Sequence, residues 1–134
     1  MQNLDKKSRK NMLQFMKLCL TTPASKKGMQ VFDNLSFALK KSYLLAALQC
    51  KEFLKFSDNM RIIEHYFKTK FKKTENIPDT TIELAFQMIV IDMILFSKSK
   101  LEDEEFLQQE DALKTFASVM KSFIKKGEVP NMLF

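Results

Sequence analysis

The sequence predicts an all-α fold, a compact bundle of five to six helices around one central hydrophobic helix. Only 2 Gly and 3 Pro occur in 134 residues, too few for the many turns of a β-sandwich or barrel. Amphipathic segments of helical period follow one another along the chain. Residues 82–96 are apolar except at Glu83, Gln87 and Asp92. A helix that is apolar on nearly all sides belongs inside a fold.

Four amphipathic helices are expected before the central one. Residues 4–20 form the first, because apolar side chains recur on one side and lysines on the other. Residues 29–40 and 43–56 form two more, with Ser42 starting the second. One helix across both is the alternative, but it would be long for a domain of this size. Three capping residues then precede a helix over residues 60–73.

The central helix is expected over residues 80–97, where Thr80 and Glu83 have the spacing of a capping box. Its apolar run is shorter than the roughly 20 residues that span a membrane, and it contains Asp92. We therefore predict a core helix of a soluble domain, and no transmembrane segment.

A last helix is expected near the end of the chain. Ser99 and Glu102 repeat the capping-box spacing, and Lys126 followed by Gly127 is typical of a helix end. Residues 1–134 are long enough for a self-sufficient core, so we predict a single helical domain. The chain closes on three apolar residues, ending at Phe134. This ending favours the N-terminal domain of a longer protein over a complete chain.

The two cysteines, Cys19 and Cys50, are isolated in the sequence. Neither belongs to a Cys-x-x-Cys motif, and both fall on apolar sides of expected helices. Buried thiols of this kind are typical of a reducing compartment. The N-terminus also lacks the uninterrupted apolar run of a signal peptide. We predict an intracellular location, in the cytoplasm or the nucleus.

The formal net charge of +6 is unevenly distributed, with a basic first half and an acidic second half. The basic half could attract the acidic half, an acidic protein partner or nucleic acid. On the helix expected over residues 60–73, basic side chains recur along one side at a spacing that can follow a phosphate backbone. The candidate phosphate or acidic-partner contacts are Arg61, His65, Lys68 and Lys72, with Lys6 and Lys10 of the first helix.

Asp92 does not fit the apolar pattern, because it lies away from the mildly polar edge of the central helix. A carboxylate in an apolar setting must be paired, hydrogen-bonded or protonated. Asp92 could be a buried polar anchor, acting as an acid/base group or as the contact for a partner's cation. We expect the ordinary alternative, in which that side of the helix meets a polar neighbour or solvent.

No motif in the chain indicates catalysis or a cofactor. One His and two distant Cys cannot form a conventional zinc site, and two glycines at expected helix ends do not form a phosphate loop. The sequence therefore favours a non-enzymatic, regulatory protein–protein interaction domain without cofactor or small-molecule substrate. A hetero- or homo-oligomeric protein partner would bind an apolar groove or dimer face, with the basic half steering an acidic partner. The alternative is a nucleic-acid-associated protein.

Overall fold

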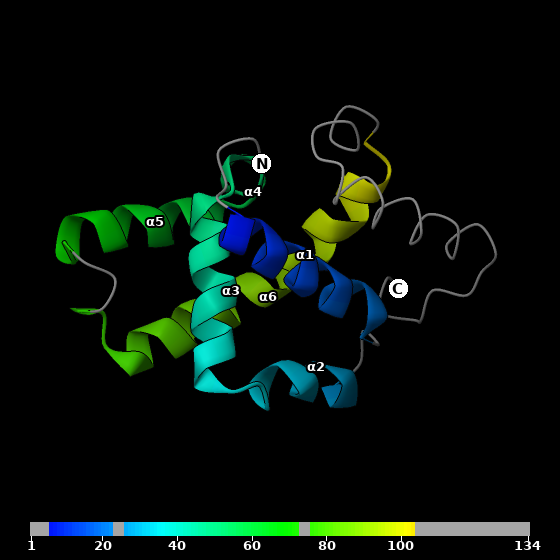
Figure 1. Ribbon diagram of the computed structural model, residues 1–134, viewed down its shortest axis with the longest axis horizontal. Coiled ribbons are helices and arrows are strands. Elements are labelled where there is room, and N and C mark those ends of the chain that lie inside the picture. The colour runs from blue at the N-terminus through cyan, green and yellow to red at the C-terminus, as the bar shows by residue number, and fades with distance from the viewer. Residues whose placement is uncertain (1–5, 23–25, 73–75, 104–134) are drawn as a thin grey trace.

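The computed structural model describes residues 6–22, 26–72 and 76–103, which form six α-helices and no strand (Figure 1). The predicted all-α class is confirmed, and the six helices of the described residues are consistent with the predicted bundle. The helices, in chain order, are α1 (Lys6–Thr21), α2 (Lys26–Asp33), α3 (Phe37–Gln49), α4 (Lys51–Phe56), α5 (Asp58–Lys70) and α6 (Asp79–Leu101).

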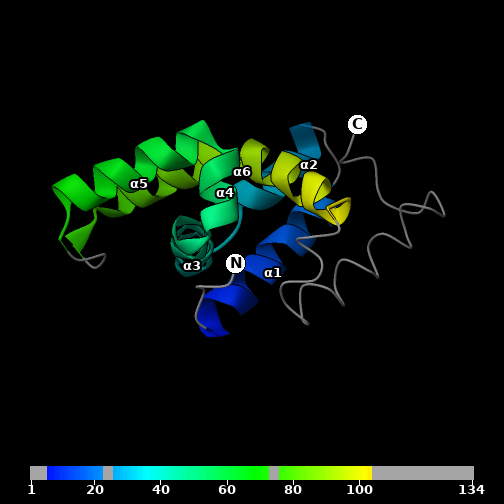
Figure 2. The same cartoon turned by 90° about the horizontal axis from the view of Figure 1, so that it is seen from above.

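The hydrophobic helix α6 occupies the centre, in contact with α1, α3, α4 and α5. Figure 2 shows α5 lying along the N-terminal part of α6, with α1 and α3 on another side. The Phe15 ring of α1 links three helices, because it stacks on Tyr43 of α3 at 4.9 Å and on Phe86 of α6 at 5.5 Å between ring centroids. Such aromatic pairs favour offset or edge contacts that fix the relative position of the helices.

The break between the second and third helices differs from the prediction. The chain interrupts the helix at Ser36, whose side-chain Oγ accepts a hydrogen bond from the Leu39 backbone N–H at 3.2 Å. Ser42, the expected start, lies inside α3. A second break at Cys50 separates α3 from α4, and no side chain caps it. Ser36 therefore caps α3, and the expected cap Ser42 does not begin a helix.

The capping residue of α5 is among those predicted. Ser57 is the N-cap, and its Oγ accepts a hydrogen bond from the Met60 backbone N–H at 3.0 Å. The helix ends at Lys70, three residues before the expected end. The first helix, α1, also matches its expected position within two residues at each end.

The central helix is longer than expected, with 23 residues from Asp79 to Leu101 in place of residues 80–97. Both predicted capping boxes are wrong. Pro78 is the N-cap residue, without a side-chain cap, and Thr80 lies inside the helix. Ser99 also lies inside it, because Ser97 and Leu101 are buried and packing continues past the polar segment. The predicted last helix, residues 102–126, falls almost entirely outside the described residues.

By length and composition alone, α6 is apolar enough to cross a membrane, and half of its most apolar window is buried inside the fold. A core helix of a soluble protein meets the same criterion. The absence of a transmembrane segment remains a prediction.

Candidate functional site

The exposed side of α6 and the adjoining side of α5 form one apolar surface. Six large apolar side chains there leave between 42% and 63% of their surface in solvent. We call this surface the α5–α6 face, and it consists of Ile62 and Tyr66 of α5 with Leu84, Met88, Ile91 and Leu95 of α6.

The two helices enclose a groove in this surface, with a volume of about 360 Å³. Four members of the face line it, and the side chains of Ile63, Phe67 and Ala85 contribute at its inner side. Thr80 and Thr81 supply hydroxyl groups at one end, and no charged residue lines the groove among the described residues. The groove can therefore take up apolar side chains, with a few hydrogen bonds to fix their orientation.

The α6 part of the face follows from the helical period. Leu84, Met88, Ile91 and Leu95 are separated by four, three and four residues, so they lie on one side of the helix. Ile91 and Leu95 thus extend the surface beyond the groove, toward the C-terminal end of α6. The opposite side of α6 supplies much of the core, including Ile89, Met93 and Phe96.

Asp92 lies at the junction of α5 and α6. Its Oδ2 accepts a hydrogen bond from Ser57 Oγ at 2.7 Å and one from Asn59 Nδ2 at 3.3 Å. The side chain is half-buried. Ser57 Oγ also caps α5 by accepting from Met60, so a single hydroxyl joins the helix cap to the carboxylate. The negative charge lies near the N-terminus of α5, where the helix dipole favours an anion.

Arg61, a predicted phosphate contact, donates hydrogen bonds to the last turn of α4. Its Nη1 donates to the carbonyl oxygens of Leu54 and Lys55 at 2.7 and 2.8 Å. These carbonyls belong to the last turn of α4, where arginine side chains satisfy groups that lack a helical partner. Its Nη2 pairs with Asp58. Most of the donor capacity of Arg61 is therefore used within the fold.

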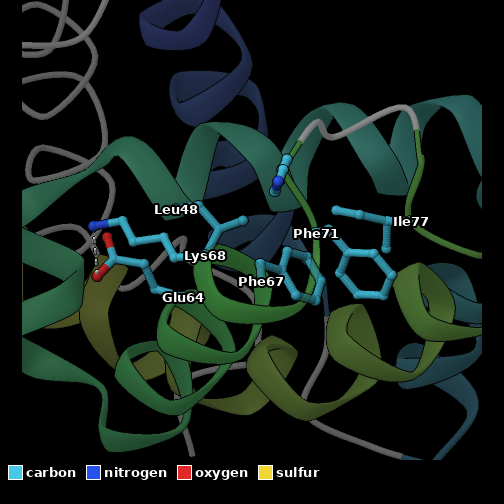
Figure 3. Close-up of a pocket in the computed structure, with 7 residues that line it drawn as sticks. Leu48, Glu64, Phe67, Lys68, Phe71 and Ile77 are labelled. Carbon is cyan, nitrogen blue, oxygen red and sulfur yellow. Dashed lines mark ion pairs between the residues drawn. The ribbon is translucent and has the colours of Figure 1, made fainter.

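Lys68 and Lys72 border a second pocket, of about 230 Å³, whose wall includes Leu48 of α3. Figure 3 shows Phe67, Phe71 and Ile77 grouped at one end of this pocket and the Glu64–Lys68 pair at the other. Lys68 Nζ lies 3.5 Å from the Glu64 carboxylate. His65 is exposed on α5, but it does not line this pocket.

Lys6 and Lys10 are exposed in the first turns of α1. Ser8, between them in sequence, donates a hydrogen bond to Gln49 Oε1 at 3.0 Å. The start of α1 therefore lies at the same end of α3 as the pocket that Lys68 and Lys72 border. Arg61, in contrast, lies near the other end of α5, beside α4. The predicted basic residues are thus not brought together at one site, because Lys68 and Lys72 border a pocket that neither Lys6 nor Lys10 lines.

Cys19 and Cys50 are both buried as free thiols. Burial raises the pKa of the Cys19 thiol well above its ordinary value of 9.0. Burial also raises the pKa of the Cys50 thiol, against smaller lowering effects of hydrogen bonds from the backbone at Phe53 and Glu52. Both thiols are therefore protonated and unreactive at neutral pH.

Within the described part of the chain, no group of three or more His, Cys, Asp or Glu side chains is placed to hold a metal ion. No protein-family model matches the chain, and no curated protein or solved structure matches it either.

The sequence predicts a groove or dimer face, but it does not indicate where on the fold this surface lies. The signal that could have located it is the spacing of Leu84, Met88, Ile91 and Leu95. Because α6 is also apolar on its other sides, the hydrophobic pattern alone does not show which side remains exposed.

Proposed function

We propose that the chain is a non-enzymatic helical interaction domain that binds a protein partner through the α5–α6 face. One observation carries the proposal: six large, exposed apolar side chains form a continuous surface that includes a groove. Isolated exposed apolar residues are ordinary on soluble proteins. A contiguous patch of several hundred Å² is typical of an interaction site.

The burial of this face would supply a substantial part of a binding free energy. Full burial of one large apolar side chain contributes about 1.5–3 kcal/mol. Since about half of each side chain is already buried, each would contribute about 1 kcal/mol more in a complex. Six such residues supply about 6 kcal/mol, which is comparable with the lower estimates of the cost of association. Polar contacts from the partner must add to this for a stable complex.

A groove between two helices that is lined by apolar side chains can bind an amphipathic helix, whose apolar side chains recur every three to four residues. The Tyr66, Thr80 and Thr81 hydroxyls at the groove are available for hydrogen bonds that fix the register of such a helix. The basic half of the chain supports steering of an acidic partner, which raises the association rate more than the affinity.

The proposal assigns the chain no catalytic step, cofactor or small-molecule substrate. It places the protein inside the cell, in the cytoplasm or the nucleus. The buried free thiols of Cys19 and Cys50 support this location, because such thiols are typical of reducing compartments.

Site-specific photocrosslinking in cells tests the proposed function. A photoreactive phenylalanine analogue replaces Leu84 on the face, and a matched control replaces Gln14, which is exposed on α1. We expect protein adducts from position 84 and not from position 14. A second change, Ile91→Lys, should reduce the adducts from position 84, because it introduces a charge into the same face. Equal adducts from both positions, or none from position 84, would contradict the proposal.

The nucleic-acid alternative predicts a different result when the chain and its bound partners are isolated from the same cells. Partner binding that depends on phosphate contacts weakens steeply as salt rises and disappears after nuclease treatment. Burial of an apolar face tolerates salt. The alternative would be favoured if nuclease treatment abolished partner binding. It would also require that the double variant Lys68→Gln and Lys72→Gln lose this binding and that Ile91→Lys leave it unchanged.

A further inference from the structure

The α6 part of the α5–α6 face has the spacing of a helix–helix contact. Leu84, Met88, Ile91 and Leu95 follow one another at intervals of four, three and four residues. Apolar residues at this repeat form the contact line of paired helices, in which each side chain inserts between side chains of the facing helix. The most fitting partner is therefore another helix that carries the same repeat.

The repeat reads the same in both directions along α6. Its midpoint falls between Met88 and Ile91, so a second α6 laid antiparallel places Leu84 opposite Leu95 and Met88 opposite Ile91. A two-fold axis at this midpoint gives a closed, isologous contact in which each residue pair occurs twice. The four residues therefore match themselves without any change of register.

Charges beside the repeat favour the same arrangement. Glu83 and Lys98 lie on one flank of it, about 100° and 40° around the helix from Leu84. The two-fold axis places this flank next to the same flank of the second copy, with Glu83 within about 3 Å along the axis of the level of Lys98. In a parallel pair, this flank lies against the α5 side of the other copy, and Glu83 and Lys98 do not meet.

The remaining charge near the repeat is compatible with this contact. Asp92 lies on the α5 side of α6, where Ser57 and Asn59 donate hydrogen bonds to it. Glu83 is about half exposed, and its Oε1 lies 3.9 Å from Lys40 Nζ. Its carboxylate can therefore accept a second cation without losing a short ion pair.

The exposed area is sufficient for a dimer. A large side chain that is half exposed leaves on the order of 100 Å² in water, so the six residues expose about 600 Å² per copy. A specific interface buries about 800 Å² per partner, and a quarter or more of this area is polar surface at its rim. The apolar area of the face is therefore close to the apolar part of such an interface. The same axis places α5 of both copies on one side of the helix pair, where Ile62 and Tyr66 enlarge the contact.

We infer that the partner of the α5–α6 face is a second copy of this chain, with the two α6 helices antiparallel about the Met88–Ile91 midpoint. The inference rests on the proposed function and makes it specific. The other candidate occupants are a helix of a different protein and the segment of this chain beyond the described residues, and the experiment separates both from a second copy.

The first measurement is multi-angle light scattering on the full-length chain over a range of concentrations. We expect a dimer that dissociates on dilution. Met88→Lys should raise the dissociation constant about 100-fold, because it places two lysines beside the two-fold axis. The matched control Gln14→Lys should leave the constant unchanged, since Gln14 is exposed on α1. A monomer at every concentration, or equal effects of both variants, would overturn the inference.

The second measurement determines the orientation by disulfide formation between differently tagged chains. Leu84→Cys mixed with Leu95→Cys should give a mixed disulfide, because an antiparallel pair places these positions together. Either variant alone should not, since position 84 lies about 16 Å along the axis from position 84 of the second copy, too far for a disulfide. Disulfides in the single variants would instead indicate parallel helices and overturn the inference. The native Cys19 and Cys50 are buried and do not interfere.

The two proposals fail in distinguishable ways. If the chain is a monomer in light scattering and position 84 gives specific adducts of another protein, the inferred dimer is wrong and the proposed interaction domain stands. Intramolecular adducts from a monomer identify the chain's own distal segment as the occupant. A monomer without adducts overturns both proposals.

Discussion

The hydrogen bond between Ser57 and Asp92 should contribute measurably to the stability of the fold. Ser57 Oγ accepts from the backbone N–H of Met60 and donates to Asp92 Oδ2 at 2.7 Å. Ser57→Ala removes both bonds. Loss of the helix cap costs about 1 kcal/mol. Loss of the bond to the carboxylate adds about 1–1.5 kcal/mol, at or just below the lower end of the range for charged acceptors, because Asp92 is half-buried. We expect a total loss of about 2–2.5 kcal/mol.

A double-mutant cycle isolates the shared bond. Asp92→Ala should lower the free energy of unfolding by about 1.5 kcal/mol, because Ser57 keeps its capping role. The double variant should lose about 1–1.5 kcal/mol less than the sum of the two single losses. Asn59→Ala is the control, since its bond to Asp92 is longer, at 3.3 Å, and we expect a loss below about 0.5 kcal/mol.

Urea unfolding followed by far-UV circular dichroism measures these differences. Small domains have free energies of unfolding of about 5–15 kcal/mol, so each variant should remain folded. Single losses that add within about 0.5 kcal/mol in the double variant would show that the two side chains do not interact. Asp92→Asn separates charge from hydrogen bonding, because the amide oxygen can still accept from Ser57. An unchanged stability of that variant would show that the negative charge itself matters little.

Three further predictions concern the core. Ser97→Ala should raise the free energy of unfolding by about 1 kcal/mol, because the buried Ser97 Oγ lacks a hydrogen-bond partner; a loss in urea unfolding would contradict this. Lys100→Met should lower it by about 1–2 kcal/mol, since Lys100 Nζ lies 3.2 Å from the Glu52 carboxylate and both are largely buried; an unchanged urea midpoint would contradict this. The raised pKa values of Cys19 and Cys50 mean that only the unfolded state ionises as the pH rises past about 9, so stability should fall there. Urea midpoints between pH 7 and pH 10 measure this fall, and a thiol reagent should label native protein at pH 7.5 far more slowly than unfolded protein.

The all-α class could be predicted because it depends on properties that the whole chain shares. Few glycines and prolines and a repeated helical period leave little room for a sheet. Helix ends were less predictable, because several residues compete as caps. Thr80, Ser99 and Ser42 all have capping side chains, yet each lies inside a helix. Burial of neighbouring residues, such as Ser97 and Leu101 beside Ser99, outweighs the small preference of a cap.

The sequence also indicated that Asp92 needs a polar partner, because an isolated carboxylate is costly in an apolar setting. It could not identify Ser57 and Asn59, which lie more than thirty positions away in the chain. Nor could it show that Arg61 donates hydrogen bonds to the carbonyl oxygens of α4. Both assignments depend on how α4, α5 and α6 pack, and local spacing does not determine that packing.

The hydrophobicity of α6 has two separate physical origins. Its buried side supplies the core, with Ile89, Met93 and Phe96 fully buried. A helix with that role alone would carry polar residues on its exposed side. Leu84 and Ile91 are instead more than half exposed, and they belong to a repeat that extends from Leu84 to Leu95 in the middle of the helix. These same residues make α6 apolar enough to meet the length and composition criterion for a membrane span. The membrane-like composition is therefore the sum of a core side and the α5–α6 face, and the proposed partner would account for the apolar residues that the core does not require.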